Sequence, residues 1–211
     1  LDICPPGIQH PEIVDVPHVQ QIRPIGFDAA PDDVVPGWVA DLPPRPTIYA
    51  TMGTFFNDAV SVFTTILDGL RNEPVNVIVT VGKDVDPAVL GPQPDNVHIE
   101  RYIPQSRLLP YCHLLVSHAG SGALLGALNA GVPMLAIPQG ADQYSNAARI
   151  VEVGLGLRLM ESDLDPIAVR DSARRLLGDG QFARVARSQK QAIEGMPSPE
   201  SVVPVLEALV I

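Results

Sequence analysis

Cysteine is scarce in this chain, with only Cys4 and Cys112 among its 211 residues. Two thiols are too few for a disulfide framework, and such usage is typical of a reducing cytosol. Basic residues are outnumbered, 14 against 24 acidic ones, and the net charge of −10 argues against general binding to nucleic acid or anionic membranes. No apolar run approaches the roughly 20 residues that cross a bilayer, and no secretory signal begins the chain. We therefore expect a cytoplasmic protein.

Proline divides the chain into two parts. Residues 1–46 contain a high density of proline, which disfavours helices and favours extended, turning backbone. We interpret 1–46 as an interdomain linker or arm and 47–211 as a ligand-binding domain. Because 46% of all residues are hydrophobic and only 18% are charged, the chain can bury a sizeable core. The first residue is Leu1, so we expect a piece of a longer protein.

From residue 47 onward, short apolar strands alternate with segments of helical spacing. The pattern predicts strands at 47–52, 75–81, 97–102, 114–117 and 134–137. It predicts helices at 58–72, 121–130, 143–153, 166–177, 181–194 and 199–209. Alternation of this kind is typical of an α/β fold, a Rossmann-like parallel sheet flanked by helices.

The most informative segment runs from a buried strand ending at Ser117 through a glycine-rich turn to a helix beginning near Ser121. Gly120 and Gly122 allow the backbone to approach a ligand closely. Free amides at a helix start suit a diphosphate, and His118 can donate a further hydrogen bond. The segment is equally consistent with a simple tight turn that His118 caps.

Two other chemistries resemble the same residues. Ala119-Gly120-Ser121-Gly122-Ala123 approximates a hydrolase nucleophile elbow, but that fold places its histidine after the serine, and no histidine follows Ser121. The glycine spacing also approximates a dinucleotide fingerprint with Asp142 as its acid. That fingerprint normally follows the first strand of its domain, whereas three predicted strands precede it here. Because the spacing still matches, a dinucleotide-binding oxidoreductase domain remains an alternative. Asp84 and Asp86 are more typical of a solvated loop than of a cation site.

Six motifs in order resemble the C-terminal domain of family 1 glycosyltransferases of the bacterial natural-product, antibiotic-tailoring type, which have the GT-B fold. The motifs are Tyr49-Ala50-Thr51-Met52-Gly53-Thr54, Val79-Thr80-Val81-Gly82, Tyr102-Ile103-Pro104-Gln105, His118-Ala119-Gly120-Ser121-Gly122, Gly131-Val132-Pro133 and Pro138-Gln139-Gly140-Ala141-Asp142-Gln143. Cys4-Pro5-Pro6 resembles the family's interdomain linker. The resemblance implies the C-terminal half of a GT-B fold that binds a nucleotide-diphosphate sugar as co-substrate, with no metal or other cofactor.

The resemblance also assigns roles along the donor. Tyr102 matches the ring that stacks on the base, the backbone of Ile103 matches the group that binds the pyrimidine edge, and Gln105 lies near the nucleoside's sugar. The diphosphate cradle corresponds to Thr54, His118, Gly120, Ser121 and Gly122. Asp142 and Gln143 match the pair that binds hydroxyls of the transferred sugar. From the residues alone, Tyr102 could equally be core, and Thr54 and Asp142 could cap helices.

Two departures from the family pattern bear on the donor. Plant members carry a ribose-binding acid at the position of Gly126, and its absence favours a thymidine diphosphate sugar over a uridine diphosphate sugar. A hydroxyl residue that often follows the glycine-rich turn is Ala123 here, which removes one donor to phosphate.

In the resembled family, an acceptor-activating histidine lies in the N-terminal domain and the reaction inverts the anomeric configuration. Nothing in this chain resembles that base, so we expect donor binding by an inverting enzyme without a catalytic residue in these 211 residues. A nucleotide-sugar-binding subunit with a separate acceptor-side chain is the alternative, and a homodimer is possible. The acceptor and the exact sugar are not encoded in any motif we identify.

Overall fold

The computed structural model describes residues 1–30, 33–53 and 59–208. Within them, the strands are β1 (Thr47–Thr51), β2 (Asn76–Thr80), β3 (Val97–Glu100), β4 (Leu114–Ser117), β5 (Met134–Ala136) and β6 (Gly156–Arg158). All of their pairings are parallel, in the order β3-β2-β1-β4-β5-β6. The expected α/β fold with a parallel sheet is confirmed.

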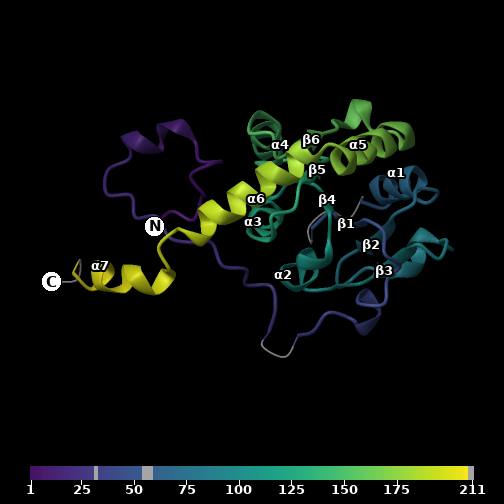
Figure 1. Ribbon diagram of the computed structural model, residues 1–211, viewed down its shortest axis with the longest axis horizontal. Helices are drawn as coiled ribbons and strands as arrows, with labels where there is room; N and C mark the ends of the chain where they lie inside the picture. The colour runs from purple at the N-terminus through teal and green to yellow at the C-terminus, as the bar shows by residue number, and fades with distance from the viewer. Residues whose placement is uncertain (31–32, 54–58, 209–211) are drawn as a thin grey trace.

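Helices cover both faces of this sheet (Figure 1). They are α1 (Ala59–Leu70), α2 (Gln105–Leu108), α3 (Ser121–Ala130), α4 (Gln143–Glu152), α5 (Pro166–Gly178), α6 (Gly180–Glu194) and α7 (Val203–Glu207). Strands β1, β2, β4 and β5 are wholly buried, as a parallel sheet between two helical layers requires, whereas the edge strands β3 and β6 are partly exposed. None of the helices described is long and apolar enough to cross a membrane.

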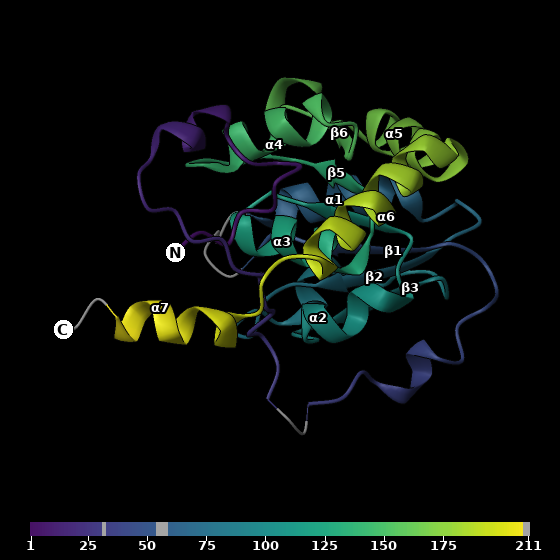
Figure 2. The same ribbon diagram turned by 60° about the vertical axis from the view of Figure 1, so that its left-hand side comes forward.

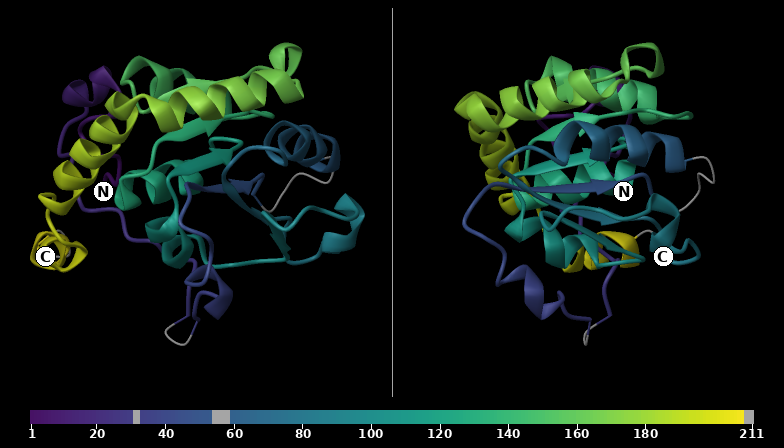
Figure 3. Two further views of the ribbon diagram at one scale, coloured as in Figure 1. Left: turned by 45° about the vertical axis from the view of Figure 1, so that its right-hand side comes forward. Right: turned by 90° about the vertical axis from the view of Figure 1, so that its right-hand side faces the viewer.

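Alternate residues of each strand serve two separate apolar layers. In β1, Ile48 and Ala50 pack with α1 and α5, whereas Tyr49 packs on the opposite side with α2, α3, α4 and α6. This division follows from the two-residue repeat of a strand, which points successive side chains to opposite faces. Figure 3 shows the sheet between these two layers.

Several expected boundaries were wrong. The sequence pattern missed β6 and α2, which are only three and four residues long. The expected helix at 199–209 is divided into a 3-10 helix, Pro199–Val202, and α7. Pro204, in the first turn of α7, has no backbone N–H to donate, which favours a break in the hydrogen-bond pattern there.

Residues 1–30 and 33–46 contact the domain at several points and contain two short 3-10 helices, Pro11–Asp15 and Gly37–Val39. The sequence pattern predicts no helix in this region, and these single turns begin at or beside proline, where its fixed φ is tolerated. Arg149 of α4 donates to the carbonyls of Ile8 and Gln9 at 3.2 Å each. The Trp38 ring stacks on His98 with centroids 4.4 Å apart. Figure 2 shows α7 extending away from the sheet.

Candidate functional site

A pocket of about 660 Å³ opens at the carboxyl ends of β1 and β4. The chain order of the strands reverses between these two neighbours, because β2 and β3 lie on one side and β5 and β6 on the other. Ligands of open α/β sheets bind at this kind of switch point. The expected site residues that line the pocket are Tyr102, Ile103, Gln105, His118, Gly120, Ser121, Gly122, Asp142 and Gln143. Thr54 lies outside the described residues.

The turn between β4 and α3 presents unpaired amides to this pocket. Gly120, the residue before the helix, has extended backbone and no side chain that could cap the helix. The N–H groups of Ser121, Gly122 and Ala123 therefore have no acceptor within the described residues. The first turn of any helix leaves such donors, which carry the positive end of the helix dipole. Ala119 has a left-handed φ of 63°, a strained conformation for a residue with a Cβ.

His118 occupies a slot between two loop glycines. A Cβ on Gly53 would lie 2.8 Å from Cε1 of the imidazole, and a Cβ on Gly120 would lie 2.4 Å from Nε2. Burial lowers the pKa of His118, whereas the Asp142 carboxylate and a hydrogen bond with the Thr51 backbone act in the opposite direction. The imidazole is therefore mainly neutral near pH 7, and a neutral ring still donates one hydrogen bond.

Asp142 stands across the turn from Ser121. Its Oδ2 accepts hydrogen bonds from the Ser121 hydroxyl at 2.8 Å and from the Asn146 amide at 3.1 Å. Asp142 is also the N-cap residue of α4, as the alternative interpretation held, but its carboxylate makes no capping bond to that helix. Asn146 also donates to the Ala119 carbonyl at 2.9 Å, so its amide links the turn before α3 to the Asp142 carboxylate.

Gln143 is almost fully buried, with 4% of its surface exposed. Its side-chain oxygen accepts from the backbone N–H groups of Gln139 at 2.8 Å and Gly140 at 3.1 Å. These bonds fix the amide plane. The amide nitrogen has no acceptor within the part of the chain that the structure describes, so it remains available as a donor at the pocket.

The opposite end of the pocket is formed around Tyr102 and Ile103. Neither the N–H nor the C=O of Ile103 forms a hydrogen bond with another described residue. The Lys83 ammonium lies 4.3 Å from the centroid of the Tyr102 ring, and the Tyr102 hydroxyl donates to the Asp28 carbonyl. Tyr102 is only half-buried, which argues against a role solely in the core.

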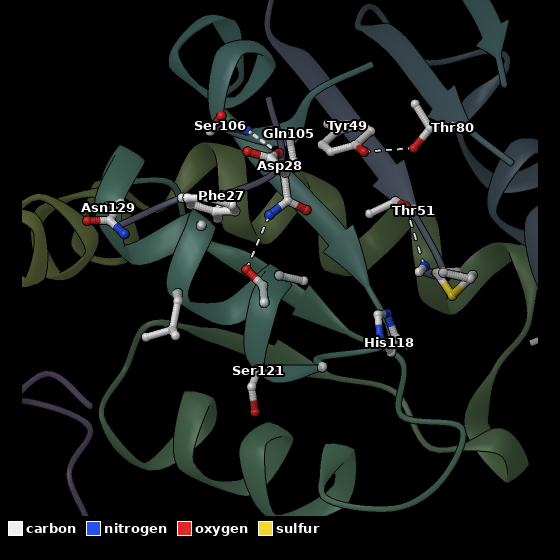
Figure 4. Close-up of a pocket in the computed structure, with 18 of the residues that line it drawn as sticks. Phe27, Asp28, Tyr49, Thr51, Thr80, Gln105, Ser106, His118, Ser121 and Asn129 are labelled. Carbon is white, nitrogen blue, oxygen red and sulfur yellow. Dashed lines mark hydrogen bonds between the residues drawn. The ribbon is translucent and has the colours of Figure 1, made fainter. Parts of the chain in front are cut away.

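Residues of the proline-rich segment complete this end of the pocket, and no sequence pattern indicated them. Asp28 accepts the Ser106 N–H at 2.9 Å, and Asn129 of α3 donates to the Pro24 carbonyl at 3.3 Å. Phe27 is fully exposed beside them (Figure 4). Asn146 was also missed, although its spacing of four residues from Asp142 places both on one helix face.

The floor of the pocket is the buried Tyr49, whose hydroxyl bonds the Thr80 hydroxyl at 2.7 Å (Figure 4). Burial raises its pKa to about 12, so the phenol stays protonated.

The Asp84–Asp86 loop lies away from the pocket lining, and Asp86 caps a 3-10 helix through the Ala88 N–H at 3.1 Å. This position agrees with the solvated-loop interpretation.

Comparisons with known proteins identify close relatives. The chain is 30% identical over 206 residues to 4'-demethylrebeccamycin synthase of Lentzea aerocolonigenes, covering 97% of this chain and 48% of the relative. It thus spans about half the length of the curated relatives it matches. The glycosyltransferase SnogD of Streptomyces nogalater superimposes with a TM-score of 0.82 at 30% identity, over 99% of this chain and 56% of that one.

A third similar structure is the spinosyn rhamnosyltransferase SpnG complexed with thymidine diphosphate. Its TM-score is 0.86 at 26% identity, and the match covers 98% of this chain and 55% of SpnG. Residues 64–209 match the family described as erythromycin biosynthesis protein CIII-like, C-terminal domain. The six-stranded sheet and its helices correspond to the C-terminal GT-B domain of these enzymes. The chain belongs to this family of natural-product glycosyltransferases and corresponds to their C-terminal domain.

Proposed function

We propose that this chain is the donor-binding domain of an inverting glycosyltransferase that uses a thymidine diphosphate sugar to modify a small natural product. The observation that carries the proposal is the order of groups along one pocket wall. The free backbone of Ile103 lies at one end, the open amides of α3 lie in the middle, and Asp142 with Gln143 lies beyond them. This sequence of groups matches base, diphosphate and sugar.

At the nucleoside end, Tyr102 offers a ring face to the base and Ile103 offers both a donor and an acceptor to a pyrimidine edge. A buried backbone N–H and C=O without partners are costly to the free protein. A pyrimidine imide presents the complementary carbonyl and N–H. Binding of the base would therefore satisfy both groups at once.

At the centre, we assign the diphosphate to the amides of Gly120, Ser121 and Gly122 with His118 beside them. An overall net charge of −10 leaves no broad positive field to attract phosphate. The helix dipole and oriented N–H groups supply that attraction locally. They would also stabilise the negative charge that grows on the departing nucleotide. Thr54 stays a proposed member of this cradle from sequence alone.

Beyond the diphosphate, Asp142 and Gln143 are assigned to hydroxyls of the transferred sugar. The carboxylate is an acceptor and the free amide nitrogen of Gln143 is a donor, so together they match a pair of sugar hydroxyls. We further propose that residues 1–46 connect this domain to an N-terminal acceptor-binding half, which supplies the base that deprotonates the acceptor. No metal takes part in this scheme.

Calorimetric titration of the purified chain tests the donor assignment. We expect binding of thymidine diphosphate, weaker binding of uridine diphosphate, and no binding of reduced nicotinamide dinucleotide. A clear preference for uridine diphosphate would overturn the thymidine assignment alone. Binding of the nicotinamide cofactor in place of either nucleotide would favour the dinucleotide-binding alternative.

The division of labour between the two halves has its own test. Given a thymidine diphosphate sugar and a polyketide or aromatic aglycone, the chain alone should form no glycoside. Sugar transfer by the chain alone would show that it carries its own base and refute this proposal.

A further inference from the structure

Asn146, in the first turn of α4, lies behind the glycine-rich turn and does not line the pocket. Its side-chain nitrogen makes two hydrogen bonds, to the Ala119 carbonyl at 2.9 Å and to Oδ2 of Asp142 at 3.1 Å. A carbonyl and a carboxylate both accept, so the group that faces them is the NH2, with one hydrogen for each. The bond to Asp142 therefore fixes the direction in which Asn146 offers its other hydrogen to Ala119.

The position of this amide follows from regular helix geometry. The backbone N–H of Asn146 donates to the Asp142 carbonyl at 3.0 Å, so the two residues lie four apart on one helical face. Helical side chains lean toward the N-terminus of their helix, which brings the Asn146 amide back toward Asp142 and the turn before α3. The amide is thus held by α4 and not by the loop that it contacts.

The Ala119 carbonyl belongs to the peptide group that joins Ala119 to Gly120. This peptide bond is trans, so its C=O and its N–H point in opposite directions. Because the carbonyl is bonded to Asn146, the Gly120 N–H points away from Asn146. Gly120 lines the pocket and Asn146 does not, which places this N–H on the pocket side of the turn. There it forms no hydrogen bond with another described residue.

The same peptide group follows a strained residue. Ala119 has a left-handed φ of 63°, which is unfavourable for a residue with a Cβ. Rotation of Ala119 to an ordinary φ would turn the peptide and move the Gly120 N–H. The hydrogen bond from Asn146 to the carbonyl opposes that rotation.

We infer that Asn146 is a positioning residue that holds the Ala119–Gly120 peptide with its N–H directed at the diphosphate. Asn146 contacts no part of the nucleotide, and Asp142 serves here as the anchor that orients the Asn146 amide. The inference rests on the proposed function, because it requires a diphosphate in this pocket.

Asn146→Ala tests this role, because it removes both hydrogen bonds and adds no charge near the phosphates. The variant should bind thymidine diphosphate about ten-fold more weakly than the wild type, the low end for one lost hydrogen bond to a charged group. Thymidine has the same base and pentose but no phosphate, and it should bind both chains equally. Calorimetry measures the first ligand, and titration followed by nuclear magnetic resonance measures the weaker second one.

Asn96→Ala provides a matched control. Asn96 is also half-buried and donates to a backbone carbonyl, that of Val75 at 3.1 Å, but it lies outside the pocket lining. Its loss should lower the melting temperature and leave the affinities for both ligands unchanged. Asn146→Leu is a second test variant that keeps a side chain of similar size, which excludes water from the place of the amide. It should reproduce the selective loss of thymidine diphosphate binding.

Amide hydrogen exchange of the wild-type chain gives a measurement that needs no variant. Thymidine diphosphate, but not thymidine, should slow exchange of the Gly120 N–H. If neither Asn146 variant folds, this measurement decides, and exchange that the diphosphate leaves unchanged would refute the inference.

The outcomes separate this inference from the proposed function. Failure of the wild-type chain to bind thymidine diphosphate would overturn the proposed function, and this inference with it. Tight binding by the wild type together with an unchanged affinity in a folded Asn146 variant would leave that function intact and refute the positioning role. Equal weakening of thymidine diphosphate and thymidine would also refute it, because a merely structural role affects both ligands alike.

Discussion

Helices α1 and α5 cover one face of the sheet, whereas α2, α3, α4 and α6 cover the other together with part of residues 1–46. The first layer is dominated by large side chains such as Phe63, Ile66 and Leu67. The second layer contains many alanines, among them Ala119, Ala123, Ala127 and Ala147. Among the core residues that line the pocket, Tyr49, Ile103 and Ala123 belong to this second layer and Met52 belongs to the first.

Small residues let backbone approach backbone, and a ligand that binds through amides needs that approach. The left-handed φ values of Ala119 and Ala141, 63° and 51°, also lie in the two loops of this pocket. We propose that the α1/α5 layer carries stability, while the α3/α4 layer gives up side-chain volume for a ligand site. Mutations in the two layers should therefore have separable effects.

The largest expected effect belongs to the α1/α5 layer. Ile66 is fully buried, and Ile66→Ala should lower the free energy of unfolding by about 2–5 kcal/mol. Val60→Ala on the exposed side of the same helix is the matched control and should change it by under about 0.5 kcal/mol. Urea denaturation measures both. Weaker nucleotide binding by Ile66→Ala, at a temperature where it is folded, would contradict the separation of the layers.

An intermediate effect, on binding instead of stability, is expected at the pocket. His118→Ala should weaken binding of thymidine diphosphate by about 1–3 kcal/mol, the typical cost of one hydrogen bond to a charged group. The exposed His10 lies outside the pocket lining, and His10→Ala should leave the affinity unchanged. Equal calorimetric affinities for the wild type and His118→Ala would remove His118 from the cradle.

The smallest effect is a pH dependence that arises in the second layer. Burial lowers the pKa of His118 below its ordinary value of 6.5, so the unfolded chain binds a proton more readily than the folded one. The stability that the neutral imidazole contributes is complete above that ordinary pKa and is lost as the pH falls through it toward the folded pKa. His118→Gln should therefore lose less stability on acidification.

Urea midpoints of the wild type and His118→Gln at pH 7.5 and at pH 5.5 measure this difference. Other groups titrate in both proteins, so only the difference between their pH responses reports on His118. Identical responses would mean that the environment of His118 does not disfavour its charged form.

Much of the fold could be predicted because its signals are local. The apolar run at Val75–Val81 and the helical spacing of Val62, Ile66 and Leu70 follow from strand and helix periodicity. The three-residue strand β6 contains Gly156 and shows no such period. A Cβ on Gly156 would lie 1.9 Å from the Met134 carbonyl oxygen, so its pairing with β5 depends on a contact that is remote in the sequence.

The candidate site was predictable where one segment carries it. The glycine-rich turn after Ser117 and the Asp142–Gln143 pair could be identified from residue types and order. By contrast, Asp28 lies 78 residues from Ser106 in the chain. Nothing in the composition of a proline-rich segment indicates that one of its residues lines a pocket. A Cβ on Gly126 would lie 2.2 Å from Nε2 of Gln105, a close approach between two elements that the sequence alone does not reveal.

By itself, the sequence determined the α/β layering, the switch-point turn and the family, because periodicity, glycine placement and motif order are properties of short segments. Only the tertiary structure decided which side chain fills the space beside each glycine and how residues of the proline-rich segment, such as Asp28, line the Tyr102 end of the pocket. Those outcomes depend on distances of a few ångströms between residues far apart in the chain. Such distances are set by how the layers pack, which no local pattern specifies.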